Sequence, residues 1–115
     1  MKKKNILLLI GNEIGFQVLK KLKELKFINL EIYTSNISLE KKDIKFLKNK
    51  KIFISKLRSS SKKFDFVICV YWPWLFPKET LKKFDNSINF HPSLLPIGRG
   101  WYPHVHALIK NLKWG

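Results

Sequence analysis

Two nearly continuous apolar runs constrain the fold of this chain more than any other feature. Residues 5–10 and 64–71 consist almost entirely of apolar side chains, which is typical of strands buried on both faces of a sheet. Shorter segments at residues 30–33, 51–54 and 87–90 predict three further strands. The chain therefore has the material for a five-stranded sheet.

The segments between these strands change to a helical period. Apolar residues Ile14, Val18, Leu22 and Leu25 form one stripe, with lysines outside it. Residues 39–47 and 77–84 predict two more helices, the second with Pro77 in its first turn, and a further helix is expected after Pro103. Alternating strands and helices predict the α/β class with a mostly parallel sheet.

Length and cysteine content favour one small domain in a reducing compartment. The chain has 115 residues, no internal repeat or Gly/Ser linker, and one cysteine, Cys69, so it forms no intrachain disulfide. The apolar run near Met1 is too short for a signal peptide, and the later run is broken by Asp65 and Pro73. We expect a soluble cytoplasmic protein without a membrane span.

The formal net charge of +15 leaves an anionic partner open, such as RNA, a nucleotide or an anionic lipid. Only Arg58 and Arg99 are arginine, and the lysines are spread from Lys2 to Lys113. Nucleic-acid recognition favours bidentate arginine. Solvation of helix faces and loops therefore accounts for most of the charge, and RNA binding remains an alternative.

Three loops follow strands and are expected at the carboxyl end of the sheet, where α/β domains bind ligands. The first is GNEIG, which begins at Gly11. The dinucleotide fingerprint needs three glycines in the pattern G-x-G-x-x-G, and only Gly11 and Gly15 are present, so an NAD or FAD site is not expected. A plain tight turn or contact with one phosphate remains open.

The third loop, NFHPSLLP, carries the strongest chemical signal. Asn89 and His91 are two apart on a strand, so their side chains share a face. Both can donate hydrogen bonds to an oxygen that gains negative charge, although a structural pair is the commoner use of such a spacing. Pro92 and Pro96 stiffen the loop, and Arg99 stands between two glycines where an anion can approach.

The middle loop, YWPWLFP, is unusually aromatic. Trp72, Trp74 and Phe76 could be core residues or the walls of a flat slot for a fused ring, because a buried Trp usually needs a partner for its N–H group. A metal site is rejected, because His104 and His106 would face opposite ways on a helix and no cysteine or carboxylate cluster accompanies them.

The segment INFHPSLLPIGRGWYP resembles the signature loop of the folate-dependent formyltransferases. These include the glycinamide ribonucleotide, methionyl-tRNA and sugar N-formyltransferases. The resemblance extends to the first strand and turn, to FDFVICVYWPWLFPKETL, and to the closing ALIKN segment. It implies a Rossmann-like fold and transfer of a formyl group from 10-formyltetrahydrofolate to an amine.

The resemblance also implies roles for individual residues. Asn89 and His91 match the catalytic Asn and His of the family. The folate site would be formed by Pro73, Trp74, Leu75, Phe76, Ser93, Leu94, Leu95 and Pro96. The amine substrate would approach Gly11, Asn12, Glu13, Ile14 and Arg99.

A third catalytic residue of the family, an Asp, would lie beyond Gly115. Residues 1–115 are therefore expected to form an N-terminal catalytic domain that is incomplete at its C-terminus and is completed by a missing half or by a homo-oligomer. The aromatic residues in RGWYP favour an amino-sugar nucleotide as the acceptor, with tRNA and glycinamide ribonucleotide as alternatives. From other classes, an inactive truncated binding module and a basic RNA-binding domain remain open.

Overall fold

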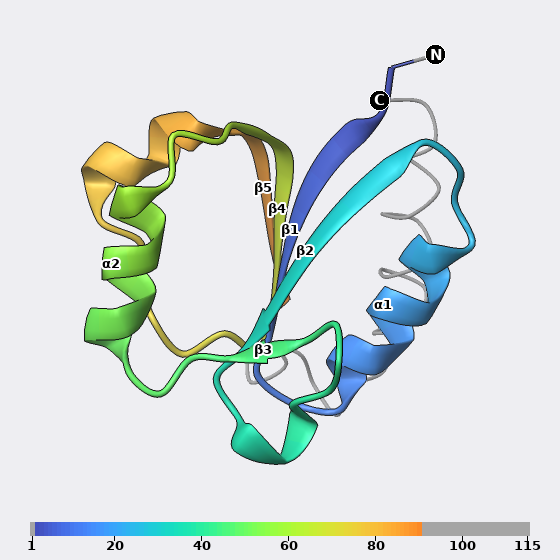
Figure 1. The fold of residues 1–115 in the computed structure, drawn as a ribbon, viewed down its shortest axis with the longest axis horizontal. Helices are drawn as coiled ribbons and strands as arrows, with labels where there is room; N and C mark the ends of the chain where they lie inside the picture. Colours follow the sequence, from blue (N-terminus) through green and yellow to red (C-terminus); the bar gives the residue numbers. More distant parts are fainter. Residues whose placement is uncertain (1, 91–115) are drawn as a thin grey trace.

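The computed structural model of the protein describes residues 2–90 and shows one twisted sheet between helices (Figure 1). The sheet has five strands in the order β3-β2-β1-β4-β5, and every strand pair is parallel. The elements in chain order are β1 (Lys4–Ile10), α1 (Ile14–Lys23), β2 (Ile28–Thr34), the 3-10 helix η1 (Ile37–Leu39), β3 (Lys45–Phe46), α2 (Lys50–Ser59), β4 (Phe64–Val70), the 3-10 helix η2 (Lys78–Lys83) and β5 (Phe84–Phe90).

The two α-helices cover opposite faces of the sheet (Figure 1). Ile6, Leu8 and Ile10 of β1 pack in the cluster that contains α1, whereas Leu7 and Leu9 pack in the cluster that contains α2. Because both faces of the strand are buried, alternation with polar residues would leave polar groups in a core. This is why residues 5–10 form an apolar run.

The parallel register brings four strand ends into one row. Ile10 pairs with Thr34 on one side and with Val70 on the other, and Val70 pairs with Phe90. The loops that follow β1, β2 and β4 therefore leave the sheet at the same level, beside the end of β5. We call this row and the loops that follow it the carboxyl end of the sheet.

The expected α/β fold with a parallel sheet is confirmed, and so are most of its elements. The apolar runs form β1 and β4, and the stripe that begins at Ile14 forms α1. Residues 77–84 contain a helix of the 3-10 type, with Pro77 at its N-cap. The helix expected after Pro103 lies outside the described residues.

The helix predicted over residues 39–47 is wrong. Leu39 ends the short helix η1, a turn closed by a bridge between Lys41 and Ile44 follows, and Lys45 begins β3. Leu39, Ile44 and Leu47 are all buried, which mimics a helical stripe. Their burial instead arises because the chain folds back, and the two-residue strand β3 pairs alongside β2.

The strand predicted over residues 51–54 is also wrong, because these residues lie in α2. The β-branched Ile52 and Ile54 favour a strand. However, Asn49 caps the helix by accepting a hydrogen bond from the Ile52 backbone N–H at 2.9 Å. Phe53 and Leu57, one helical turn apart, then bury one face of α2 against the sheet. Across residues 2–90, no helix is long and apolar enough to cross a membrane.

Candidate functional site at the carboxyl end of the sheet

Hydrogen bonds between loop and strand join three of the strand ends. The Gly11 N–H donates to the Val70 carbonyl at 2.7 Å, and the Tyr71 N–H donates to the Phe90 carbonyl at 3.2 Å. The loops that follow β1 and β4 are thus fixed to each other and to the end of β5. We call residues 71–77, which follow β4, the aromatic turn. The structure therefore brings Gly11, the aromatic turn and the strand tip that carries Asn89 together, as the sequence predicted.

The loop after β1 is a tight turn that starts α1. The Asn12 side-chain oxygen accepts a hydrogen bond from the Ile14 N–H at 2.9 Å. It thereby pairs one of the backbone N–H groups in the first turn of α1 that have no partner within the helix. Glu13 is the N-cap residue and is exposed to solvent. The roles predicted for Gly11, Asn12, Glu13 and Ile14 in binding the amine substrate stay predictions.

Thr34 is a residue of this site that was not predicted from the sequence. Its buried hydroxyl donates to the Ile10 carbonyl at 2.7 Å and accepts from the Asn36 N–H at 3.1 Å. The hydroxyl therefore ties the end of β1 to the loop after β2. A threonine as the last residue of a buried strand, followed by Ser and Asn, is the only signal that the sequence offers for this contact.

The aromatic turn after β4 packs on α2 through Phe53. The Phe53 ring centroid lies 5.1 Å from that of Trp72 and 5.9 Å from that of Trp74. It also lies 5.3 Å from the Phe76 centroid, and the Trp72 and Trp74 centroids are 5.1 Å apart. The edge-to-face arrangement of most of these pairs leaves little freedom for the rings. Phe53 was not predicted at this site, because its segment was expected to be a strand.

The four residues of the aromatic turn that were predicted for the folate pocket divide into two pairs. Trp74 and Phe76 are half-buried and pack against the apolar cluster that contains α2. Pro73 is exposed, and Leu75 keeps 81% of its surface accessible. Leu75 therefore offers an apolar surface at the tip of the turn, while the indole and phenyl rings form its base.

The Trp72 side chain carries an unpaired donor. Only 6% of Trp72 is exposed, and its Nε1–H finds no hydrogen-bond partner among residues 2–90. Burying such a group without a partner costs about 1–3 kcal/mol. An acceptor supplied by a bound ring would remove this cost, so the aromatic turn fits a flat ligand with acceptor atoms on its edge.

Asn89 lies on β5 beside the end of β4. Its Cα pairs with that of Cys69, whose side chain is buried in the cluster that contains α2. Paired residues of neighbouring parallel strands direct their side chains to the same face. Because Cys69 packs in the same cluster as Trp72, Asn89 lies on the face of the sheet that also carries the aromatic turn. Asn89 is exposed on that face.

The remaining predicted site residues, His91, Ser93, Leu94, Leu95, Pro96 and Arg99, lie outside the described residues. The shared face of Asn89 and His91 therefore stays a prediction. Cys69 is no candidate nucleophile, because burial raises the pKa of its thiol to about 12 and keeps it protonated at neutral pH. Within residues 2–90, no three metal-binding side chains (His, Cys, Asp or Glu) lie together.

The fold and this site define a Rossmann-like α/β domain with a candidate site at the carboxyl ends of its parallel strands, where such domains bind ligands. The comparisons with known proteins identify its family. A model of the formyl transferase family, N-terminal domain, matches residues 2–113. The chain therefore belongs to the formyl transferase family. Searches of curated proteins and of solved structures found no significant match.

Proposed function

We propose that this chain transfers a formyl group from 10-formyltetrahydrofolate to the amine of an amino-sugar nucleotide. The observation that supports this most directly is the aromatic turn, with the unpaired Trp72 donor, on the same face of the sheet as Asn89. The family match over residues 2–113 supplies the class of reaction. We expect the reaction to take place in the cytoplasm, where the lone Cys69 stays reduced.

The residues of the aromatic turn fit a pterin ring. Trp74 and Phe76 offer flat apolar surfaces, and Trp72 offers one N–H group that needs an acceptor. A pterin is a fused ring with carbonyl and nitrogen acceptors on its edge. Ser93, Leu94, Leu95 and Pro96 are proposed to complete the pocket on the basis of the signature loop.

Asn89 and His91 are proposed to stabilise the negative charge that develops during transfer. The amine nitrogen bonds to the formyl carbon, and the bond from that carbon to the folate nitrogen then breaks. The amine proton passes to the folate nitrogen that loses the formyl group. While both nitrogens are attached, the former carbonyl oxygen is anionic, and each donor that is already in place there lowers the barrier by about 3–4 kcal/mol.

The aromatic residues in RGWYP favour a nucleotide sugar as the acceptor. The net charge of +15 suits its diphosphate, and it suits a ribonucleotide or tRNA equally. The acceptor class is therefore tested with a panel. Formyl transfer should be fastest to an amino-sugar nucleotide, and faster transfer to methionyl-tRNA or glycinamide ribonucleotide would redirect the assignment.

The catalytic assignment is tested by single substitutions in the same assay. Asn89→Ala and His91→Ala should each reduce kcat roughly a hundredfold or more, because each removes one donor to the oxyanion. Ser87→Ala is the matched control, since Ser87 is exposed on β5 two residues before Asn89. Unchanged rates in the Asn89 and His91 variants, or equal losses in the control, would refute these roles.

A further inference from the structure

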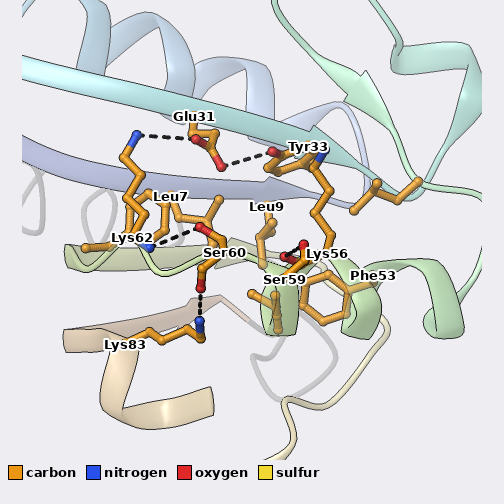
Figure 2. Close-up of a pocket in the computed structure, with 13 residues that line it drawn as sticks. Leu7, Leu9, Glu31, Tyr33, Phe53, Lys56, Ser59, Ser60, Lys62 and Lys83 are labelled. Carbon is orange, nitrogen blue, oxygen red and sulfur yellow. Dashed lines mark hydrogen bonds and ion pairs between the residues drawn. The ribbon is translucent and has the colours of Figure 1, made fainter.

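A cavity lies between α2 and the sheet (Figure 2). Its volume is about 330 Å³. Lys83, directly before β5, and Phe64, the first residue of β4, both line it, so it extends toward the amino ends of these strands. We call it the α2 cavity. No step of the proposed formyl transfer uses it.

The floor of the α2 cavity is apolar. It is formed by Leu7, Leu9, Leu47, Phe53, Leu57 and Phe64. All six side chains are buried in the cluster that contains α2, so the floor is a stable part of the core. Phe53 also packs on Trp72 of the aromatic turn, and its ring therefore lies between the two sites.

The rim of the α2 cavity is cationic, with Lys56, Lys62 and Lys83 around one carboxylate. That carboxylate, Glu31, is already satisfied. Its Oε2 accepts a hydrogen bond from the Tyr33 hydroxyl at 2.9 Å, and its Oε1 lies 3.3 Å from Lys62 Nζ (Figure 2). Glu31 therefore balances the charge of Lys62 and leaves the other two lysines uncompensated.

Lys56 and Lys83 have no carboxylate partner among the described residues, whose ion pairs are Lys23–Asp43, Arg58–Glu79 and Lys62–Glu31. The Lys56 ammonium lies 5.5 Å from the centroid of the Tyr33 ring. The Lys83 ammonium donates to the Ser60 carbonyl after the end of α2 (Figure 2). Both ammonium groups are thus held beside the cavity by contacts that leave their charge available.

We propose that the α2 cavity binds a small amphiphile with a compact aromatic body and one anionic group. The aromatic body would rest on the apolar floor, and the carboxylate, sulfonate or phosphate would meet Lys56 and Lys83. The volume of about 330 Å³ is at the lower end of the range for ligand pockets, which fits one or two rings. Ser59 and Ser60 add hydroxyl groups on the same rim.

The competing interpretation of Lys83 is purely structural. A lysine at the end of a helix stabilises the last carbonyl groups, and Lys83 does so at Ser60. That role does not involve Lys56 and requires no ligand. A binding measurement that separates the charge of the ligand from its shape therefore distinguishes the two interpretations.

The test uses the full chain and two probes of nearly equal shape, 2-naphthoate and the neutral 2-naphthamide, measured by calorimetry. Naphthoate should bind more tightly than naphthamide. The double variant Lys56→Gln/Lys83→Gln should weaken naphthoate binding roughly tenfold and leave naphthamide binding unchanged. Lys20→Gln/Lys26→Gln is the control, because it removes the same charge from the opposite side of the sheet, on and just after α1.

Two further measurements locate the bound probe. Ser59→Phe should weaken the binding of both probes, because the larger side chain would occupy part of the cavity rim. Tetrahydrofolate should not displace naphthoate, since the aromatic turn is a separate site. The proposal is overturned by equal affinities for the two probes, by an equal loss in the control variant, by displacement with tetrahydrofolate, or by absence of binding to the folded chain at millimolar concentration.

Discussion

Gly11 lies directly against the backbone carbonyl of Tyr71. A Cβ atom added to Gly11 would be 1.8 Å from that oxygen, which no side-chain movement can relieve because the obstacle is backbone. The same contact holds the loop after β1 against the aromatic turn after β4. Gly11 is therefore needed for the close approach of the two loops.

Gly11→Ala should destabilise the fold by about 3 kcal/mol, because the new methyl group forces the two loops apart. The free energy of unfolding measured in urea checks this. Ser61→Ala, at an exposed position, is the control and should change stability by less than about 0.5 kcal/mol. A Gly11→Ala variant as stable as that control would contradict the observed contact.

Phe27→Gly should be more stable than Phe27→Ala by about 1 kcal/mol. Phe27 has a φ of 62°, in the left-handed region that glycine adopts without strain, and both variants lose the same partly exposed ring. At Lys26, one residue earlier and also exposed, the glycine variant should not be more stable than the alanine variant. Thermal unfolding of the four proteins compares them directly, and a Phe27→Gly variant no more stable than Phe27→Ala would contradict the expectation.

Cys69 should make the protein less stable in alkali. Burial raises the pKa of its thiol to about 12, so above the thiol's ordinary pKa the unfolded state releases a proton that the native state keeps. The free energy of unfolding should therefore fall by up to about 1.4 kcal/mol per pH unit from roughly pH 9 upward. In Cys69→Ala the decline over roughly pH 9–10.5 should be shallower, and parallel curves would contradict a buried neutral thiol.

The sheet was predictable from the sequence because burial on both faces leaves a long apolar run in β1 and β4. The prediction failed between residues 39 and 54, where local preference and tertiary packing disagree. Ile52 and Ile54 favour a strand, yet the Phe53–Leu57 spacing and the Asn49 cap place them in α2. The missed signal was an Asn three residues before the N–H that it caps.

The candidate site was predictable to the extent that it follows from strand ends. Parallel strands place their carboxyl ends together, so the order of strands and loops along the chain was enough to group Gly11, the aromatic turn and Asn89. Phe53 could not be added to this group, because its contact with Trp72 depends on α2 crossing that face. Thr34 was missed for a related reason, since its hydroxyl bonds to the backbone of a neighbouring strand.

Asn49→Ala should destabilise the fold by about 1 kcal/mol, since it removes the acceptor for the Ile52 N–H at the start of α2. Asn49→Asp and Asn49→Ser should retain most of the stability because both keep a side-chain oxygen. Lys48→Ala, at the preceding exposed position, is the control. Urea unfolding distinguishes these variants, and equal stability of all four substitutions would mean that the cap contributes nothing.

Trp72→Phe should weaken tetrahydrofolate binding while changing the stability of the fold little. It removes a buried N–H that has no partner within residues 2–90, so the gain from losing an unsatisfied donor offsets much of the lost packing, and stability should change by about 1 kcal/mol or less. Tetrahydrofolate affinity, measured by calorimetry, should fall roughly tenfold, as expected for one lost hydrogen bond. Phe84→Leu, in the same apolar cluster, should lose stability without losing affinity. Unchanged tetrahydrofolate binding in Trp72→Phe would mean that the indole N–H does not meet the ligand.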